Sequence, residues 1–286
     1  MLKADELKIY TLCENGVARS GLSAEWGYSV LIKAADKTIL FDTGTSGIAV
    51  ENAYNMGLDL TDVDMIVLSH GHYDHTGGLK AALERIRKEI PIIAHPDMFS
   101  LKYSYREKTD SYHYTGIPYN QALLESLGGR FEFATGPYWI TDDIATSGEE
   151  PQTTGYETIP DTLRIKTDSG YKPDPLTDDL SMYIRTDLGV VVVLGCAHRG
   201  MINILEHAKK VMETDNLYMV VGGTHLMTAD DNRVSKTIDA LREMNLKWIG
   251  TSHCTGFTSA AKVYNAFPDN FFVNNAGSVI KFPFKG

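Results

Sequence analysis

The residues best suited to chemistry are concentrated at positions 69–78, which read Ser-His-Gly-His-Tyr-Asp-His-Thr-Gly-Gly. Within this stretch, three histidines stand close to one aspartate. Neutral imidazole is the commonest metal ligand in proteins, whereas clustered histidines without a metal would repel one another on protonation or need separate partners. A carboxylate beside them is typical of a catalytic zinc or iron site. The pattern therefore predicts bound metal rather than a solvated loop.

This motif lies between an expected strand and an expected helix. Residues 65–68 form a short apolar run that predicts a buried strand. In the loop that follows, His70 and His72 can bind one ion, while Asp74 and His75 face a second. Free N–H groups and the positive dipole end at the helix start favour Asp74 and an anionic substrate nearby. The helix is expected because apolar residues recur at helical spacing, namely Leu79, Ala82, Leu83, Ile86 and Ile90.

The His-x-His-x-Asp-His pattern resembles the central motif of the metallo-β-lactamase superfamily. Upstream, Phe41-Asp42-Thr43-Gly44 stands in the place of that superfamily's strand-end aspartate. Later motifs at 195–200 (GCAHRG), 222–226 (GGTHL) and 252–256 (SHCTG) follow successive apolar runs. Together with Glu14-Asn15 and Glu25-Trp26-Gly27, they resemble the branch that includes archaeal 7,8-dihydropterin-6-yl-methyl-4-(β-D-ribofuranosyl)aminobenzene 5′-phosphate synthase. The resemblance covers essentially the whole chain.

The apolar runs predict two halves of similar construction. Short β-branched runs in the first half predict strands at 7–12, 28–32, 38–41, 65–68 and 92–94. Those of the second half lie at 163–165, 180–184, 190–194, 217–221, 248–249 and 271–273, with helical patterns at 202–211 and 234–244. Strands buried on both faces, with helices between them, favour an α/β fold in which two mixed sheets are flanked by helices, the αββα sandwich. We expect one domain over residues 1–286.

The resemblance implies further metal ligands in the second half of the chain. His253 matches the superfamily's final histidine, and His198 is the next expected ligand. Cys196 stands where the superfamily commonly carries a bridging aspartate or sometimes a cysteine. A thiolate ligand there would favour zinc, whereas an inert thiol would leave a water or hydroxide as the bridge. Asp179, or its neighbour Asp178, could replace the superfamily's third histidine, although an aspartate before a strand is often a turn residue.

Other polar residues near these motifs are expected to support the site. Asp42 would accept an N–H from a ligand histidine and fix its tautomer. His225 could contact substrate or donate a proton, or could equally be a core histidine bonded to the backbone. Arg199 could assist the leaving group or bind an anion. Cys254 is expected to be a small buried side chain beside His253.

Residues 96–177 interrupt the strand pattern and are rich in tyrosine, glycine, proline and charge. We expect this insertion to lean over the metals. There, Tyr103 and Tyr105 could stack on a planar ring, and Lys102 and Arg106 could bind phosphate. The alternative is an aromatic surface excursion that packs on itself or on a second subunit, so a dimer is an open possibility.

The expected chemistry depends on two divalent cations, with zinc favoured and iron or manganese also acceptable to histidine and aspartate. Such a pair activates a water or stabilises a leaving group. We therefore expect a dinuclear hydrolase or transferase for a small anionic substrate that bears a phosphate or an ester, with Asp74 orienting the attacking water. The family resemblance adds a second possibility, a synthase that condenses a pterin pyrophosphate with an arylamine. A di-iron oxidoreductase and a metal-binding protein without catalytic activity are the alternatives from other classes.

Composition limits the partners. The net charge of -10 argues against a nucleic-acid footprint, which needs a basic face. The chain has 3 cysteines at wide spacing, which fit reduced thiols better than a disulfide framework. Acids at Asp5 and Glu6 stand where a signal peptide needs an apolar core, and no run is long enough to cross a bilayer. We expect a cytoplasmic protein without a membrane partner.

Overall fold

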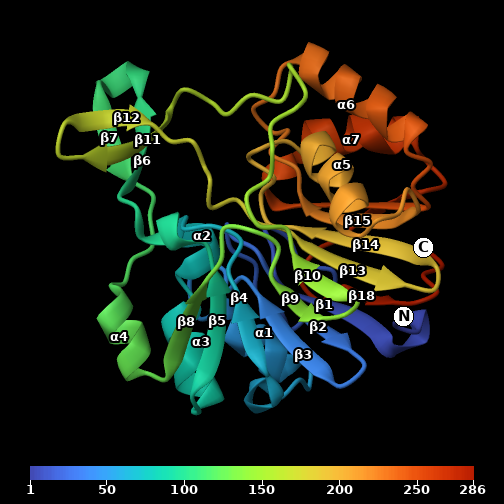
Figure 1. Cartoon of the computed structure of the whole chain (residues 1–286), viewed down its shortest axis with the longest axis horizontal. Helices are drawn as coiled ribbons and strands as arrows, with labels where there is room; N and C mark the ends of the chain where they lie inside the picture. The colour runs from blue at the N-terminus through green and yellow to red at the C-terminus, as the bar shows by residue number, and fades with distance from the viewer.

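The computed structural model describes all 286 residues and contains two large sheets packed face to face (Figure 1). The first sheet has seven strands in the order β18 (Val279–Lys281), β1 (Leu7–Cys13), β2 (Ser29–Ala34), β3 (Lys37–Phe41), β4 (Met65–Val67), β5 (Ile90–Ala94) and β8 (Gly129–Phe133). The second has seven in the order β17 (Phe271–Val273), β16 (Trp248–Ser252), β15 (Leu217–Gly223), β14 (Gly189–Leu194), β13 (Met182–Thr186), β10 (Ile144–Thr146) and β9 (Trp139–Thr141).

Helices cover the outer face of each sheet. The first sheet carries α1 (Ile48–Asn55) and α3 (Leu79–Ile86), and the second carries α5 (Met201–Val211), α6 (Asp231–Glu243) and α7 (Phe257–Ala266). Two shorter helices are α2 (Tyr73–Thr76) and α4 (Gln121–Ser126). The 3-10 helices are Ala4–Glu6, Leu60–Asp62, Pro96–Phe99, Glu107–Thr109 and His253–Thr255. This arrangement confirms the expected αββα sandwich. None of the helices combines the length and the apolar character that a bilayer crossing requires.

Strand alternation explains why both faces of the sheets are buried. In β3, Ile39 and Phe41 point into the core between the sheets, whereas Leu40 points outward to the layer that α1 and α3 cover. In β14, Val191 and Val193 reach the same central core from the opposite side. Because side chains alternate with a period of two, each strand needs apolar residues at nearly every position. This requirement explains the continuous apolar runs in the sequence.

Parallel strands bring the chemical motifs to one edge of the sandwich. Strands β3, β4 and β5 are parallel in the first sheet, and β14, β15 and β16 are parallel in the second. The segments that follow their carboxyl ends include Asp42, the 69–78 motif, Cys196, His225 and His253. Ligands of open α/β sheets bind outside the carboxyl ends of the strands. The topology alone therefore places these motifs around a common region.

One helix is shorter than the sequence predicted. The apolar spacing placed Ile90 in the helix with Leu79 and Ile86, but α3 ends at Ile86 and Ile90 begins β5. Arg87 follows the helix in the left-handed region, with φ of 57°, which stops helical propagation. Ile90 then pairs with Gly129 of β8, so strand pairing overrides the helical spacing.

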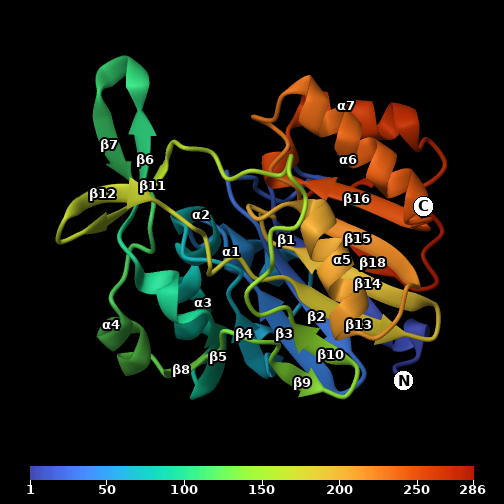
Figure 2. The same ribbon diagram turned by 45° about the horizontal axis from the view of Figure 1, so that its top comes forward.

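The excursion expected over residues 96–177 is not continuous. Its middle returns to the sandwich, since β8 pairs with β5 and β10 pairs with β13. The remaining strands form a separate four-stranded sheet in the order β12 (Gly170–Pro173), β11 (Leu163–Thr167), β6 (Lys102–Arg106) and β7 (Ser111–Tyr114). Figure 2 shows its two hairpins projecting from the sandwich. We call this unit the small sheet.

A buried ion pair fastens the small sheet to the metal-motif loop. Lys102 of β6 is 1% exposed, and its ammonium contacts the carboxylates of Asp174 at 2.9 Å and Asp178 at 2.8 Å. Asp178 also accepts a hydrogen bond from the backbone N–H of Gly71 at 2.8 Å. No side chain would fit at Gly71, because a Cβ atom there would lie 2.0 Å from the carbonyl oxygen of Met98. The glycine of the motif is therefore required by close packing.

Lys102→Ala should destabilise the protein by about 3–5 kcal/mol, because it leaves two buried carboxylates without their cation. Lys108→Ala is the matched control, since Lys108 is exposed on the same segment, and it should stay within about 0.5 kcal/mol. Urea unfolding at neutral pH measures both changes. A Lys102→Ala variant as stable as the control would contradict this role for the ion pair.

Candidate metal centre

Three histidines form the first group of potential donors. The Nε2 atoms of His70 and His198 lie 3.2 Å apart, and the ring of His72 lies 4.7 Å from that of His70 and 5.0 Å from that of His198. All three side chains are buried, and the Nε2 atom of His72 has no hydrogen-bond partner. Buried polar atoms normally find partners. Three imidazoles converging in this way provide lone pairs for one cation.

Asp74, His75 and His253 form the second group. The Nε2 atom of His253 lies 3.3 Å from Oδ2 of Asp74, and the rings of His75 and His253 lie 5.1 Å apart. The indole Nε1–H of Trp26 donates to the same Asp74 oxygen at 2.8 Å. Trp26 therefore fixes the orientation of Asp74 at the edge of the group.

Cys196 lies between the two groups. Its sulfur atom is 3.1 Å from Nε2 of His75. The potential ligand atoms of Cys196, His70 and His198 all lie within 4.8 Å of one another, and the same holds for Cys196, His75 and His253. A single thiolate could thus contact ions held by either group. This is the place where the sequence left open a bridging role for Cys196.

Asp42 holds His75 in position from beneath. Its Oδ2 atom lies 2.6 Å from Nδ1 of His75, and its two oxygens also accept from the backbone N–H and the hydroxyl of Ser69, each at 2.7 Å. The contact with Nδ1 leaves Nε2 of His75 to face Cys196. This is the geometry expected when a carboxylate orients a ligand histidine. Asp42 itself has a φ of 56°, a strained conformation of the kind that concentrates at functional sites.

Burial and neighbouring charge set the protonation of these histidines. Burial lowers the pKa of His70 and His198 well below the usual value, and lowers that of His72 to about 3. These rings are therefore neutral and have free lone pairs at neutral pH. Burial also opposes protonation of His75, but the Asp42 carboxylate outweighs it and raises the pKa of His75 to about 9. A divalent cation at Nε2 would replace that proton.

The donor set fits transition-metal cations. It combines imidazole with one carboxylate and one thiol, and zinc accepts nitrogen, oxygen and sulfur ligands alike. The Nε2 atom of His72 is buried without a hydrogen-bond partner, and a cation could satisfy its lone pair. The donors of each group are close enough together to hold a metal ion.

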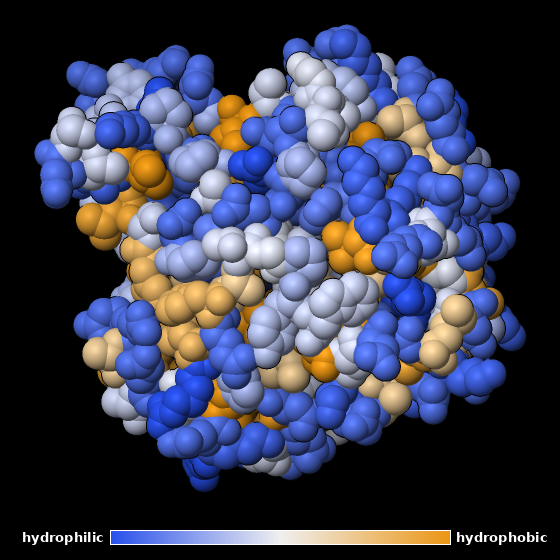
Figure 3. All heavy atoms as spheres, viewed as in Figure 1, coloured by the Kyte–Doolittle hydropathy of each residue, from blue (hydrophilic) through white to orange (hydrophobic).

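A cavity of about 240 Å³ opens onto both groups. The small sheet contributes Ser104 and Leu163 to its wall, and Thr115, which directly follows β7, adds a hydroxyl oxygen that is buried without a partner. Figure 3 shows the molecule hollowed between the small sheet and the helices of the second main sheet. The complete lining comprises Trp26, His72, Tyr73, Asp74, Ser104, Thr115, Leu163, Cys196, His198, His225, His253 and Cys254.

Several residues expected at the site point elsewhere. The guanidinium of Arg199 donates to the backbone carbonyls of Glu150 and Pro175, at 2.8 Å for Pro175, and does not line the cavity. Asp179 accepts from the backbone N–H of Arg199 at 2.9 Å and joins neither donor group. The ammonium of Lys102 is held by its two carboxylates. These contacts argue against the roles that the sequence suggested for the three side chains.

The tyrosines of the small sheet pack on one another rather than on the cavity. Tyr103 lies edge-on to Tyr114 and Tyr171, with ring centroids 5.4 Å and 5.1 Å away, and Tyr105 lies 5.0 Å from Tyr112. Alternation along β6 turns Ser104 to the cavity instead. Arg106 is exposed at the end of β6 and is not among the residues that line the cavity. The geometry thus favours the alternative in which the aromatic cluster packs on itself.

Sequence reasoning understated two residues. Cys254 accepts from the backbone N–H of His225 at 3.2 Å and lines the cavity, and its sulfur lies within 4.8 Å of potential ligand atoms of Cys196 and His225. Cys254 therefore forms part of the cavity wall, in addition to lying beside His253. The sequence singles out Trp26 only as part of the Glu25-Trp26-Gly27 motif, because its contact with Asp74 depends on the tertiary fold. His225 lies on the cavity wall, and its Nδ1 atom is buried without a partner.

Comparisons with known proteins agree with this geometry. Residues 27–209 match the family model described as the metallo-beta-lactamase superfamily. The chain is 34% identical over 292 residues to the 7,8-dihydropterin-6-methyl-4-(beta-D-ribofuranosyl)-aminobenzene-5'-phosphate synthase of Methanocaldococcus jannaschii, covering 98% of each chain. It is 33% identical to an uncharacterized protein of the same organism, covering 90% of this chain and 93% of the other.

A solved structure has the same overall architecture. Tm1679, described as a metal-dependent hydrolase of the beta-lactamase superfamily, superposes with a TM-score of 0.81 at 26% identity, covering 96% of this chain and 98% of the other. These matches confirm the family resemblance inferred from the sequence motifs.

Cys196→Ala should weaken binding of both metal ions, because the thiol lies within reach of both donor groups. His72→Ala should lose one ion only. Metal content after dialysis, measured by inductively coupled plasma mass spectrometry, distinguishes the two results, with His113→Ala as an exposed control. Retention of both ions by Cys196→Ala would exclude Cys196 as a shared ligand.

Asp42→Asn should lower the affinity for the second ion by about 10–100-fold, because an amide cannot hold His75 as the carboxylate does. The affinity for the first ion should change little. Competition titration with a chromophoric chelator measures both constants. Asp36→Asn, an exposed change of the same type, serves as the control.

Proposed function

The chain belongs to the metallo-β-lactamase superfamily, and from this we propose that it is a dinuclear-metal-dependent enzyme. It would act as a hydrolase or transferase on a small anionic substrate that carries a phosphate or an ester. The observation that supports this most directly is the pair of donor groups that meet at Cys196.

Two cations held there would supply Lewis acidity and activate water or stabilise a leaving group. The chain's own residues bind, orient and exclude solvent. Asp74, oriented by Trp26, lines the cavity and can accept a hydrogen bond from an attacking nucleophile. His225 also lines the cavity, with its ring 4.2 Å from that of His198, and its Nδ1 atom without a partner could exchange a proton with a leaving group.

The residues of the cavity wall indicate which groups would bind the negative charge of a substrate. No lysine or arginine lines the metal cavity, so an anionic group within it would depend on the cations themselves. Ser104 and Thr115 can donate hydroxyl hydrogens to that group, because both lie on the wall. This arrangement suits a reacting phosphate or carboxyl oxygen that approaches the metals directly.

A second candidate is the synthase reaction named for the archaeal relative, which is supported by identity over nearly the full length of both chains. In that reaction, an arylamine nitrogen would form a bond to a pterin methyl carbon while the carbon–oxygen bond to pyrophosphate breaks. The amine must also release a proton, which His225 could accept. The same cavity can serve hydrolysis of a phosphate ester and this displacement, because negative charge develops on phosphate oxygens in both reactions and cations in the site would stabilise it.

Di-iron redox chemistry and metal binding without catalysis are less well supported. The clustered donors are histidines and cysteines, and the only carboxylate on the cavity wall with them is Asp74, which contacts His253. A protein that contained iron with reversible redox spectra and no hydrolytic activity would favour the redox alternative.

The metal-loaded protein should hydrolyse bis(4-nitrophenyl) phosphate, and His72→Ala should lower kcat/KM at least 100-fold because it removes a ligand of one donor group. Chelation should abolish the activity and added zinc or manganese should restore it. His113→Ala should match the wild type. A chelated protein that retains full activity would contradict the proposal.

The synthase candidate has its own assay. Pyrophosphate release from a pterin methyl pyrophosphate should rise with added arylamine if the chain is a transferase, and should be independent of the amine if it is only a hydrolase. Mass spectrometry of the carbon–nitrogen product separates the two results.

A further inference from the structure

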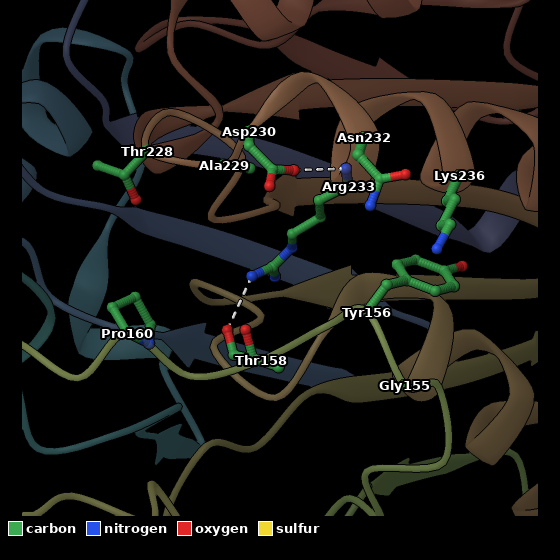
Figure 4. A pocket seen from close by; sticks show the side chains of 10 residues that line it. All are labelled: Gly155, Tyr156, Thr158, Pro160, Thr228, Ala229, Asp230, Asn232, Arg233 and Lys236. Carbon is green, nitrogen blue, oxygen red and sulfur yellow. Dashed lines mark hydrogen bonds between the residues drawn. The ribbon is translucent and has the colours of Figure 1, made fainter.

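A second pocket, of about 460 Å³, lies outside the metal cavity and has no lining residue in common with it. Two segments form it, one around residues 155–160 and the other at the start of α6, residues 228–236. Figure 4 shows side chains from both segments facing one another across it. Nothing in the proposed metal chemistry uses this pocket.

Arg233 is the unusual residue of the pocket. It is only 7% exposed, and one of its terminal nitrogens, Nη1, donates to the carbonyl oxygen of Thr158 at 2.9 Å. Its Nε and Nη2 atoms have no partner. A buried guanidinium with unmet donors is destabilised unless an acceptor reaches it. Figure 4 shows the guanidinium extending from α6 across the pocket toward Thr158.

Neighbouring carboxylates do not meet this need. Asp230 accepts from the backbone N–H of Arg233 at 2.7 Å and thereby caps α6. The two oxygens of Glu157 accept from the backbone N–H groups of Ile202 and Asn203, each at 2.9 Å. None of the ion pairs of the structure includes Arg233. Glu157 and Asp230 still act on the charge of Arg233 through space, but neither carboxylate bonds its Nε or Nη2 atom.

The surroundings add further positive charge. Lys236 lies one helical turn after Arg233, with its ammonium 5.5 Å from the centre of the Tyr156 ring. Helix α6 has 13 residues, and its dipole favours negative charge at its amino terminus, where the Asp230 carboxylate already accepts from the N–H of Arg233. Asp231, an acid in the first turn, is paired with Lys262. Oxyanions such as phosphate match a guanidinium fork and an ammonium at this spacing.

The same two segments connect the pocket to the metal cavity. Leu163, which lines the metal cavity, donates its backbone N–H to the carbonyl of Pro160 in the second pocket at 3.0 Å. His225 of the metal cavity is followed by Thr228 of the second pocket. Because an extended residue spans at most about 3.6 Å, the Cα atoms of His225 and Thr228 lie within about 11 Å. A small molecule could bridge the two pockets.

We propose that the Arg233 pocket binds a second phosphate group of the substrate whose other end reacts at the metals. This inference rests on the proposed function. It narrows the substrate to molecules with two anionic groups, one at the reacting bond and one held in the Arg233 pocket. The distal group would select and orient the substrate without taking part in bond breaking.

Inorganic phosphate titrated into the metal-loaded protein by calorimetry tests the site directly. The titration should include one class of phosphate sites whose affinity falls at least fivefold in Arg233→Gln and in Lys236→Glu. His72→Ala should leave the affinity of that class unchanged. Lys236 is exposed, so its variant does not depend on core packing. Arg242→Ala removes a cation from the same helix outside this pocket and should leave the titration unchanged. Identical titrations for the wild type and both pocket variants would overturn the proposal.

Kinetics test whether the pocket serves the metal reaction. Two esters are compared, namely thymidine 5′-(4-nitrophenyl phosphate) with and without a phosphate on its 3′-oxygen. The ester that carries the 3′-phosphate should have a KM about tenfold lower, and Arg233→Gln should make the two KM values equal. The absence of the difference in the wild type, with hydrolysis intact, would overturn the inference alone. Loss of metal-dependent hydrolysis of both esters would instead contradict the proposed function.

Discussion

The structure depends on one topological constraint, namely that the carboxyl ends of parallel strands from two different sheets meet at one edge of the sandwich. Strands β3 and β4 bring Asp42 and the 69–78 motif to that edge, while β14, β15 and β16 bring Cys196, His225 and His253. Residues far apart in sequence thus become neighbours without any local interaction between them. The buried apolar faces of both sheets fix this alignment, since a one-residue slip would turn every core side chain outward.

Polar contacts then set the orientation of the side chains that the sheets bring together. Asp42 and Ser69 orient His75, and Trp26 orients Asp74. The Lys102 ion pair connects the small sheet, through Asp178 and Gly71, to the loop that carries the histidines. The contacts of Asp42 and Lys102 are buried, so they are strong in a low-dielectric interior and costly to break. The small sheet can therefore form part of the cavity wall even though it projects from the sandwich.

The sequence predicted the αββα fold and the compact histidine motif, because strong apolar runs and ligand spacing are local signals. It predicted that Asp42 would hold a ligand histidine, and Asp42 contacts Nδ1 of His75, whereas it assigned Lys102 and Arg199 to the substrate. The sequence could not locate the partners of these two basic residues, because proximity to a motif does not indicate which acceptors the fold brings to a side chain. Lys102 meets two buried carboxylates, and Arg199 meets backbone carbonyls. The small sheet, the contact between Trp26 and Asp74 and the Arg233 pocket likewise depend on pairings between distant segments, which no spacing rule encodes.

The central claim is that the two donor groups, which meet at Cys196, each hold a cation in the active protein. X-ray absorption spectroscopy of the metal-loaded protein tests it most directly. The account predicts a sulfur scatterer at about 2.3 Å from the metal and a second metal at about 3.5–4 Å. A spectrum that contained only nitrogen and oxygen neighbours, with no metal at that distance, would contradict it.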